Sequence, residues 1–204
     1  QLDLIRLSLN MMDMDRLQNI YYDSKGSFDG AGSGLDRIKL EQATQRILDL
    51  VVKKATVYAD DICWDGLKLE GENLWSIQPV GMSFYDGISG IAVFLSFMHR
   101  LGYLQKTDID AILVDKVCRY VDTPAFQLET KTGLYVGIGA LIHTYLLLYD
   151  IQQDEKCLIC ARKAAKRISE IYAHDQIYDL FAGNAGVMCA LVKLYEVVHD
   201  REDL

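Results

Sequence analysis

The chain has 204 residues, of which 50% are hydrophobic, and a formal net charge of −8 at pH 7. This composition is that of an ordinary globular protein, long enough for one sizeable domain. The acidic balance argues against non-specific binding of nucleic acid and against binding to anionic membrane surfaces. The longest apolar stretch, from Gly87 to Met98, is shorter than the roughly 18 residues that indicate a membrane span. We therefore expect neither nucleic acid nor a membrane among the partners.

The first residue is Gln1 rather than Met, and we expect the sequence to be a piece of a longer protein. Its five cysteines are an odd number, in a chain large enough to fold without disulfides, which favours free thiols in the reducing cytoplasm. Cys157 and Cys160 have the C-x-x-C spacing of zinc and redox sites. However, they lie within one continuous predicted helix, 154–173, and no second C-x-x-C pair occurs in the sequence. We interpret both as buried helical thiols.

In chain order, the first predicted region is a lead-in over residues 1–34, which ends in the Gly/Ser-rich loop Ser24 to Gly34. The apolar periodicity of residues 35–59 predicts an amphipathic helix. Between Ile62 and Val80, apolar and polar residues alternate around Gly71-Glu72-Asn73, which predicts a small β-hairpin near 62–80. We expect the remainder of the chain to be helical.

One pattern recurs three times in the helical part, near 84–95, 134–145 and 180–191. Each copy has an aromatic residue two places before a glycine, then a second small residue, then an apolar helix. The second copy has Ala140 where the others have their second glycine, so that its glycine stands one place earlier. The glycines of the three copies are Gly87 and Gly90, Gly137 and Gly139, and Gly183 and Gly186.

The helices that follow these glycines are apolar nearly all round, whereas the helices between them, 107–120 and 154–173, have one polar face. Inner apolar helices wrapped by an outer amphipathic layer form an α/α-toroid. The sequence therefore predicts an all-α fold, a partial α/α-toroid in which the N-termini of the inner helices converge at one end. The alternative is a helical solenoid in which the glycines serve packing alone.

The three repeats resemble the first three glycine repeats of the LanC-like cyclases, the enzymes that form lanthionine thioether rings. The motifs that carry the resemblance are Tyr85-Asp-Gly-Ile-Ser-Gly-Ile, Gly133-Leu-Tyr-Val-Gly-Ile-Gly and Tyr178-Asp-Leu-Phe-Ala-Gly-Asn-Ala-Gly. In the family's third repeat an aspartate stands four residues before the first glycine, as Asp179 does before Gly183.

A looser resemblance concerns the region before the repeats. The start of the chain, the helix at 35–59 and the stretch from Trp64 to Trp75 look like the junction between dehydratase and cyclase in LanM-type, class II lanthipeptide synthetases. This resemblance makes residues 35–204 the N-terminal portion of a LanC-like cyclase domain. It also implies an upstream dehydratase domain and a downstream cyclase half as partners.

The chemistry that the resemblance implies is the addition of a cysteine thiol to dehydroalanine or dehydrobutyrine in a ribosomally made precursor peptide. Zinc is the cofactor of the full-length family enzymes. Their zinc ligands lie in Trp-Cys-x-Gly-like and Cys-His-Gly-like motifs, and this sequence contains neither motif. We therefore expect no metal ligands in this stretch, and no activity from it alone.

Asp179 is the candidate catalytic residue that the resemblance implies, as a general acid/base or as the group that orients a histidine. Without the resemblance, an aspartate just before a helix is a capping or loop-fixing carboxylate. Tyr85, Tyr135 and the repeat glycines are candidates for substrate binding or for a structural role. We expect Asp86 to stabilise its turn and His143 to be a hydrogen-bonded core histidine.

Two other functions are compatible with the helical repeats. A different α/α-toroid enzyme, such as a glycosidase, requires paired carboxylates and several exposed tryptophans at the ends of the inner helices. Trp64 and Trp75 are the two tryptophans of the sequence, and both precede the repeats. The remaining alternative is a non-catalytic helical scaffold that binds peptides.

Overall fold

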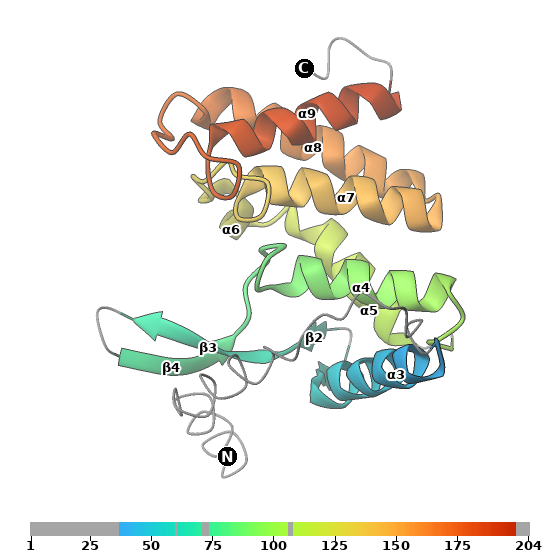
Figure 1. Cartoon of the computed structure of the whole chain (residues 1–204). Coiled ribbons are helices and arrows are strands. Elements are labelled where there is room, and N and C mark those ends of the chain that lie inside the picture. Colours follow the sequence, from blue (N-terminus) through green and yellow to red (C-terminus); the bar gives the residue numbers. More distant parts are fainter. Residues whose placement is uncertain (1–36, 60, 71–73, 106–107, 199–204) are drawn as a thin grey trace, which may run out of the picture. The chain divides into compact units, whose positions relative to one another are not determined.

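The computed structural model describes residues 37–59, 61–70, 74–105 and 108–198, so the lead-in region 1–34 lies outside the described residues. The described part is mostly helical, as predicted, with two small two-stranded sheets (Figure 1). Within it, no helix has the length and apolar character needed to cross a bilayer. The elements are α3 (Arg37–Lys54), β1 (Thr56–Tyr58), β2 (Asp61–Cys63), β3 (Asp65–Glu70), β4 (Leu74–Pro79), α4 (Ile88–Arg100), α5 (Asp108–Tyr120), α6 (Pro124–Gln127), α7 (Ile138–Gln152), α8 (Glu155–Ile171) and α9 (Asn184–Val198).

The described residues divide into two compact units, one of 37–44 with 67–70 and 74–77, and the other of 45–59, 61–66, 78–105 and 108–198. The smaller unit contains most of β3 and β4, which pair in a two-stranded sheet. The predicted hairpin near 62–80 is therefore confirmed. The functional candidates from the glycine repeats all belong to the larger unit.

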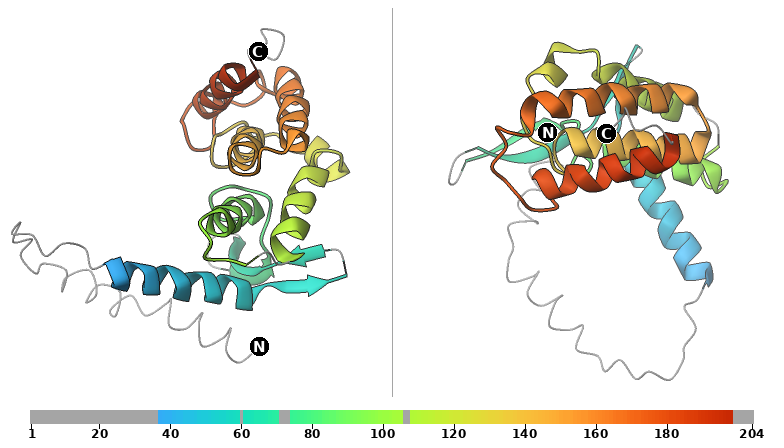
Figure 2. Two further views of the ribbon diagram at one scale, coloured as in Figure 1. Left: turned by 90° about the vertical axis from the view of Figure 1, so that its right-hand side faces the viewer. Right: turned by 90° about the horizontal axis from the view of Figure 1, so that it is seen from above.

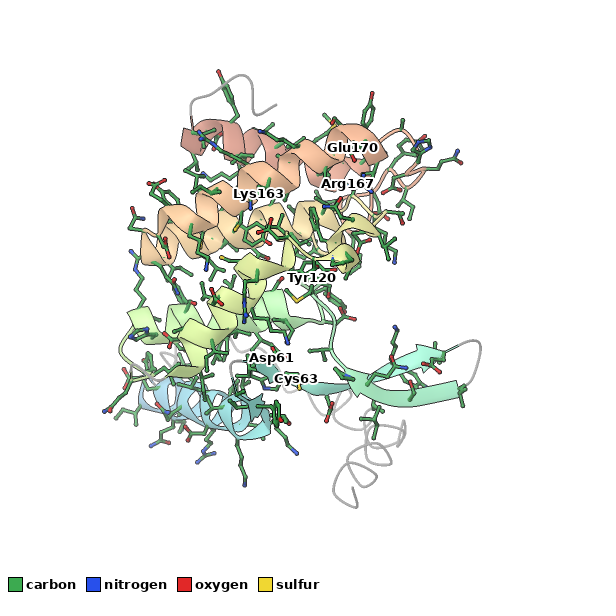
Figure 3. The ribbon with its side chains drawn as sticks, turned by 180° about the vertical axis from the view of Figure 1, so that it is seen from behind. Asp61, Cys63, Tyr120, Lys163, Arg167 and Glu170 are labelled. Carbon is green, nitrogen blue, oxygen red and sulfur yellow. The ribbon has the colours of Figure 1, made fainter. Side chains whose placement is uncertain are left out.

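The helix predicted over 35–59 ends at Lys54, earlier than expected, and a second hairpin follows it. Thr56, Val57 and Tyr58 form β1, which pairs antiparallel with β2. These are residue types that favour strands. The prediction of helix beyond Lys54 was wrong because it rested on the spacing of apolar residues alone. Tertiary contacts fix the hairpin, since Lys116 of α5 pairs with Asp61, labelled in Figure 3, at 2.7 Å.

The helices of the larger unit lie in two layers, as the left view of Figure 2 shows. The inner helices α4, α7 and α9 run in the same direction, with their N-terminal ends on one side (Figure 1). The inner helix α7 buries residues around its whole circumference, from Ile138 to Leu148. The outer helix α8 buries one face only, and its Lys163, Arg167 and Glu170 lie on the opposite face (Figure 3). The predicted inner and outer layers are confirmed.

Each inner helix begins with the same backbone hydrogen bond. The N–H of the residue after the first glycine donates to the carbonyl seven residues earlier, at 2.8 to 2.9 Å: Ile88 to Gly81, Ile138 to Lys131 and Asn184 to Ile177. The chain closes so tightly that a Cβ on the first glycine would lie within 2.4 Å of a carbonyl oxygen in all three loops. Gly137 additionally has φ of +103°, a conformation that side chains disfavour.

The second glycines let the loops approach a further backbone carbonyl. A Cβ on Gly90 would lie 2.3 Å from the carbonyl oxygen of Phe84, and one on Gly139 would lie 2.4 Å from that of Thr132. At Gly186 the Cβ would also lie 2.3 Å from the backbone nitrogen of Leu134, which belongs to the preceding repeat. The glycine pattern therefore encodes both the loop turns and the contact between repeats.

Adding one methyl group at Gly183 tests this constraint. Gly183→Ala places a Cβ 2.1 Å from the carbonyl oxygen of Ile177, so the loop must open, and we expect the free energy of unfolding to fall by about 1–3 kcal/mol. The matched control is Gly81→Ala, whose Cβ meets nothing within 4 Å. Urea denaturation of both variants measures the difference, and equal stability of the two would contradict the loop argument.

The three repeats also allow the surroundings of α9 to be compared with those of its counterparts. Met188 stands five residues after Gly183 and is 65% exposed. The residues five places after Gly87 and Gly137 are Ala92 and Ile142, and both are fully buried. The corresponding faces of α4 and α7 are therefore covered by neighbouring residues, whereas the face of α9 that carries Met188 is exposed.

An apolar groove lies beside this face, between α8 and α9. The groove has a volume of about 620 Å³. Tyr172, Val187, Met188 and Leu191 are among its apolar lining residues, and Arg162 and Lys166 are among its polar ones. An exposed apolar helix face beside such a groove favours association.

We expect this chain by itself to self-associate through the exposed face of α9. Met188→Lys places a charge where association would bury it, so the variant should shift towards monomer. Leu128→Lys is the control, since Leu128 is also exposed but does not line the groove. Sedimentation velocity at several concentrations measures the shift, and a strictly monomeric unmodified chain would contradict this prediction.

Candidate functional site

The three glycine loops lie against one another through backbone hydrogen bonds. The N–H groups of Phe84 and Tyr85 in the first loop donate to the carbonyl oxygen of Tyr135 in the second, at 3.1 and 3.2 Å. In turn, the N–H of Tyr135 donates to the carbonyl oxygen of Phe181 in the third loop, at 3.1 Å. The loops that begin α4, α7 and α9 thus form one continuous surface, as the repeat pattern predicts.

The aromatic residues of the three motifs meet on this surface. We call Phe84, Tyr85, Tyr135 and Phe181 the loop aromatic cluster. The ring of Phe181 stacks on that of Tyr135, with centroids 5.6 Å apart, and meets the edge of Tyr85 at 4.9 Å. Tyr85 is 68% exposed, so the cluster presents an aromatic ring to solvent. An exposed ring with a phenolic hydroxyl suits contact with a peptide.

Asp179 lies in the third loop and is exposed. Its Oδ1 accepts a hydrogen bond from the N–H of Ala182 at 2.7 Å. No hydrogen bond to its Oδ2 occurs among the described residues. The carboxylate therefore fixes the loop, as the structural interpretation expects, and this bond engages its Oδ1.

Asp86 is a carboxylate of the first loop that stands directly before Gly87, whereas Asp179 stands four residues before Gly183. Its carboxylate accepts a hydrogen bond from the hydroxyl of Ser83, and its N–H donates back to that hydroxyl at 3.3 Å. Both contacts stay within the turn, as predicted for a turn-stabilising residue. The two loop carboxylates thus each hold their own loop.

A buried carboxylate that the sequence analysis did not single out joins the second and third repeats. Asp175 Oδ2 accepts hydrogen bonds from the N–H and the hydroxyl of Thr132, at 2.9 and 2.8 Å. The Thr132 hydroxyl also contacts Oδ1 of Asn184, whose amide donates to the carbonyl oxygen of Asp175 at 2.7 Å. The one sequence signal was the polar Asn184 directly after the repeat glycine.

Burial by itself raises the pKa of Asp175, but hydrogen bonds from the Ile177 N–H and from Thr132 outweigh it and hold the pKa below its ordinary value. The charged form therefore stabilises the folded state above the ordinary aspartate pKa. This contribution is lost as the pH falls through the lowered value.

His143 lies one helical turn into α7, beneath the loop aromatic cluster. It is half-buried, and its ring meets the edge of Phe84 at 5.2 Å. Among the described residues it makes this ring contact rather than the hydrogen bond that we expected. Burial lowers the pKa of His143, which favours the neutral imidazole. It lines a cavity of about 390 Å³ together with Leu134, Cys189 and Lys193.

The C-x-x-C cysteines are buried, as predicted, and belong to a group of three thiols. Cys118 Sγ lies 3.9 Å from Cys157 Sγ, and Cys160 Sγ donates to the carbonyl oxygen of Cys118 at 3.4 Å. The contact with Cys157, together with burial, raises the pKa of Cys118 to about 12. The thiols of Cys118 and Cys160, whose pKa values are both raised, therefore stay protonated and unreactive at neutral pH.

Zinc, which the resemblance implies, does not fit the described residues. They contain no group of three or more His, Cys, Asp or Glu side chains that would hold a metal ion. The three buried thiols are not supplemented by a fourth ligand, and a raised thiol pKa opposes the thiolate form that zinc requires.

The family model described as lanthionine synthetase C-like protein matches residues 78–204. The chain belongs to the lanthionine synthetase C-like family. The match includes all three glycine loops and the inner helices that follow them. A search of curated proteins returned no match. The lanthionine synthetase C-like match begins after most of the β3–β4 hairpin, so the LanM-type junction stays a prediction.

Proposed function

We propose that this chain is part of a lanthionine cyclase, which adds cysteine thiols of a precursor peptide to dehydroalanine or dehydrobutyrine in the same peptide. The family match over the three interlocked glycine loops carries the proposal. The lead-in resemblance extends it to a class II synthetase with an upstream dehydratase domain and a downstream cyclase half. Free thiols at all five cysteines agree with work in the reducing cytoplasm.

The reaction requires proton transfer at two points. The thiol loses its proton, sulfur bonds to the β-carbon of the dehydro residue, and the resulting enolate takes a proton at the α-carbon. Asp179 suits this task because it is exposed on the loop surface and its Oδ1 alone is engaged by the loop. We assign it the role of general acid/base, or of the group that orients a histidine.

The zinc of the family enzymes would polarise the substrate thiol. Since the described residues do not fit this metal, we propose that its ligands belong to the downstream cyclase half. This stretch then supplies loop surface, aromatic contacts and Asp179, and is inactive alone.

Asp179→Asn tests the catalytic role in the intact enzyme. The amide oxygen still accepts the Ala182 N–H, so the loop should fold and metal should stay bound, while the acid/base group is gone. We expect ring closure to slow by a factor on the order of 10²–10⁴. Thiol alkylation followed by mass spectrometry counts the unclosed rings.

Asp86→Asn is the control, because it changes a carboxylate that holds the first loop without touching the proposed catalytic group. Dehydration of the peptide should continue in both variants, since that reaction belongs to the upstream domain. Near-normal cyclisation by Asp179→Asn, or the same loss in both variants, would reduce Asp179 to a loop-fixing residue.

The loop aromatic cluster supplies the proposed peptide contact. Tyr85→Ala removes its most exposed ring, and we expect the KM for the precursor peptide to rise several-fold, at about 1 kcal/mol of lost contact, with kcat nearly unchanged. Tyr58→Ala is the control, since Tyr58 is also highly exposed but lies in β1. Steady-state kinetics of both variants distinguish loss of the loop contact from loss of any exposed tyrosine ring. An unchanged KM in Tyr85→Ala would exclude the ring from peptide binding.

The glycosidase alternative is not favoured by the side chains found here. Trp64 is buried in the core, where its indole N–H donates to the carbonyl oxygen of Val51 at 2.8 Å, and Trp75 lies in β4. Neither tryptophan belongs to the glycine loops that would bind a sugar. A non-catalytic peptide-binding scaffold would bind the precursor through Tyr85 yet show no effect of Asp179→Asn, so the two experiments above distinguish it.

A further inference from the structure

A second cavity lies at the other end of the inner helices. It has a volume of about 390 Å³. The C-terminal turns of α4 and α7 and the N-terminal turn of α5 surround it, whereas the glycine loops lie at the N-terminal ends of α4 and α7. The lining residues are Ser96, His99, Arg100, Asp110, Ala111, Ile151 and Gln152.

Asp110 is the central group of this cavity. It is only 6% exposed. Its Oδ2 lies 2.7 Å from Nδ1 of His99, but its Oδ1 is buried and has no hydrogen-bond partner among the described residues. A buried carboxylate oxygen without a donor is costly. The cavity therefore contains a strong acceptor to which the described residues supply no donor.

The neighbouring polar groups add further acceptors. Gln152 Nε2 donates to the Ser96 hydroxyl at 3.1 Å, which leaves the amide oxygen of Gln152 available to accept. His99 uses Nδ1 to contact Asp110. Its Nε2 is then an acceptor whenever the ring is neutral. These groups match a ligand with several N–H donors on one atom.

The local charges favour a cationic ligand. Two helices, α4 and α7, direct their C-terminal, partially negative ends at the cavity, and Asp110 adds a carboxylate. The N-terminal end of α5 and the Arg100 side chain add positive charge and so oppose the binding of a cation. However, the Arg100 guanidinium is engaged, because its Nη1 donates to the carbonyl oxygen of Asp150 at 2.9 Å.

We propose that this cavity binds a primary ammonium group, with Asp110 Oδ1 as its charged acceptor. An ammonium group carries the positive charge and the three donors that the cavity requires. Its source is either a lysine side chain or the α-amino group of a peptide or small amine. This site is separate from the proposed cyclase surface and does not depend on that function.

Three probes test the proposal on the full chain. N-acetyl-lysine amide presents a side-chain ammonium, glycine amide presents an α-ammonium, and N-acetyl-norleucine amide has the length of lysine without its charge. We expect one or both amines to bind with a Kd on the order of millimolar or tighter and to shift the His99 imidazole signals in NMR titrations. The norleucine probe should leave them unchanged.

Asp110→Asn keeps the size of the side chain and removes its charge, so amine affinity should fall at least about tenfold. Asp122→Asn is the matched control, since Asp122 forms an exposed pair with Lys163 at 2.8 Å outside the cavity. Should Asp110→Asn fail to fold, Gln152→Met removes the exposed amide acceptor instead, and we expect it to weaken binding several-fold.

The proposal is overturned if neither amine binds, in which case water alone satisfies Asp110 Oδ1. Equal binding of the norleucine probe would show an apolar pocket and also overturn it. Unchanged amine affinity in a folded Asp110→Asn or Gln152→Met variant would place the amine elsewhere. The amine that shifts the His99 signals identifies the source of the ammonium group. A shift by N-acetyl-lysine amide indicates a lysine side chain, and a shift by glycine amide indicates an α-amino group.

Discussion

The structure depends on one close backbone contact, repeated three times. In each loop the Cα of the first glycine lies so near the carbonyl of the residue six places earlier that a methyl group would sit within 2.4 Å of its oxygen. This approach lets the next N–H close a hydrogen bond across the loop and begin an inner helix. Helix direction, loop spacing and the position of each aromatic side chain follow from it.

The contact matters for function because it allows the loops to lie on one another. A side chain at Gly186 would push the third loop away from Leu134, and the Tyr135–Phe181 stack would then separate. Asp175, Thr132 and Asn184 hold the same two repeats together from the buried side. The loop of Asp179 is therefore supported on two sides, and Tyr85 of the first loop contacts the second loop through its N–H bond to Tyr135 and the third through its ring contact with Phe181. Such support suits the proposed peptide site.

The repeats, the two helix layers and the β3–β4 hairpin could be predicted from sequence because glycine spacing and apolar periodicity are local signals. The end of α3 and the β1–β2 hairpin could not, since their boundary depends on tertiary contacts such as that of Lys116 with Asp61. Asp175 was missed for the same reason: it is 43 residues from Thr132 and has no spacing signature. His143 was placed correctly in α7, but its partner is the Phe84 ring of another repeat.

The two ends of the inner helices offer opposite chemistry. At the N-terminal ends the glycine loops lie at the positive ends of the helix dipoles, and at the C-terminal ends Asp110 and the last turns of α4 and α7 present acceptors. Since α7 has 15 residues, its ends lie about 22 Å apart, too far for one small ligand to span. A charge change at Asp110 should therefore leave the proposed ring closure intact. Conversely, the loss of cyclisation on changing Asp179 should leave ammonium binding unaffected, so the two proposals stand or fall separately.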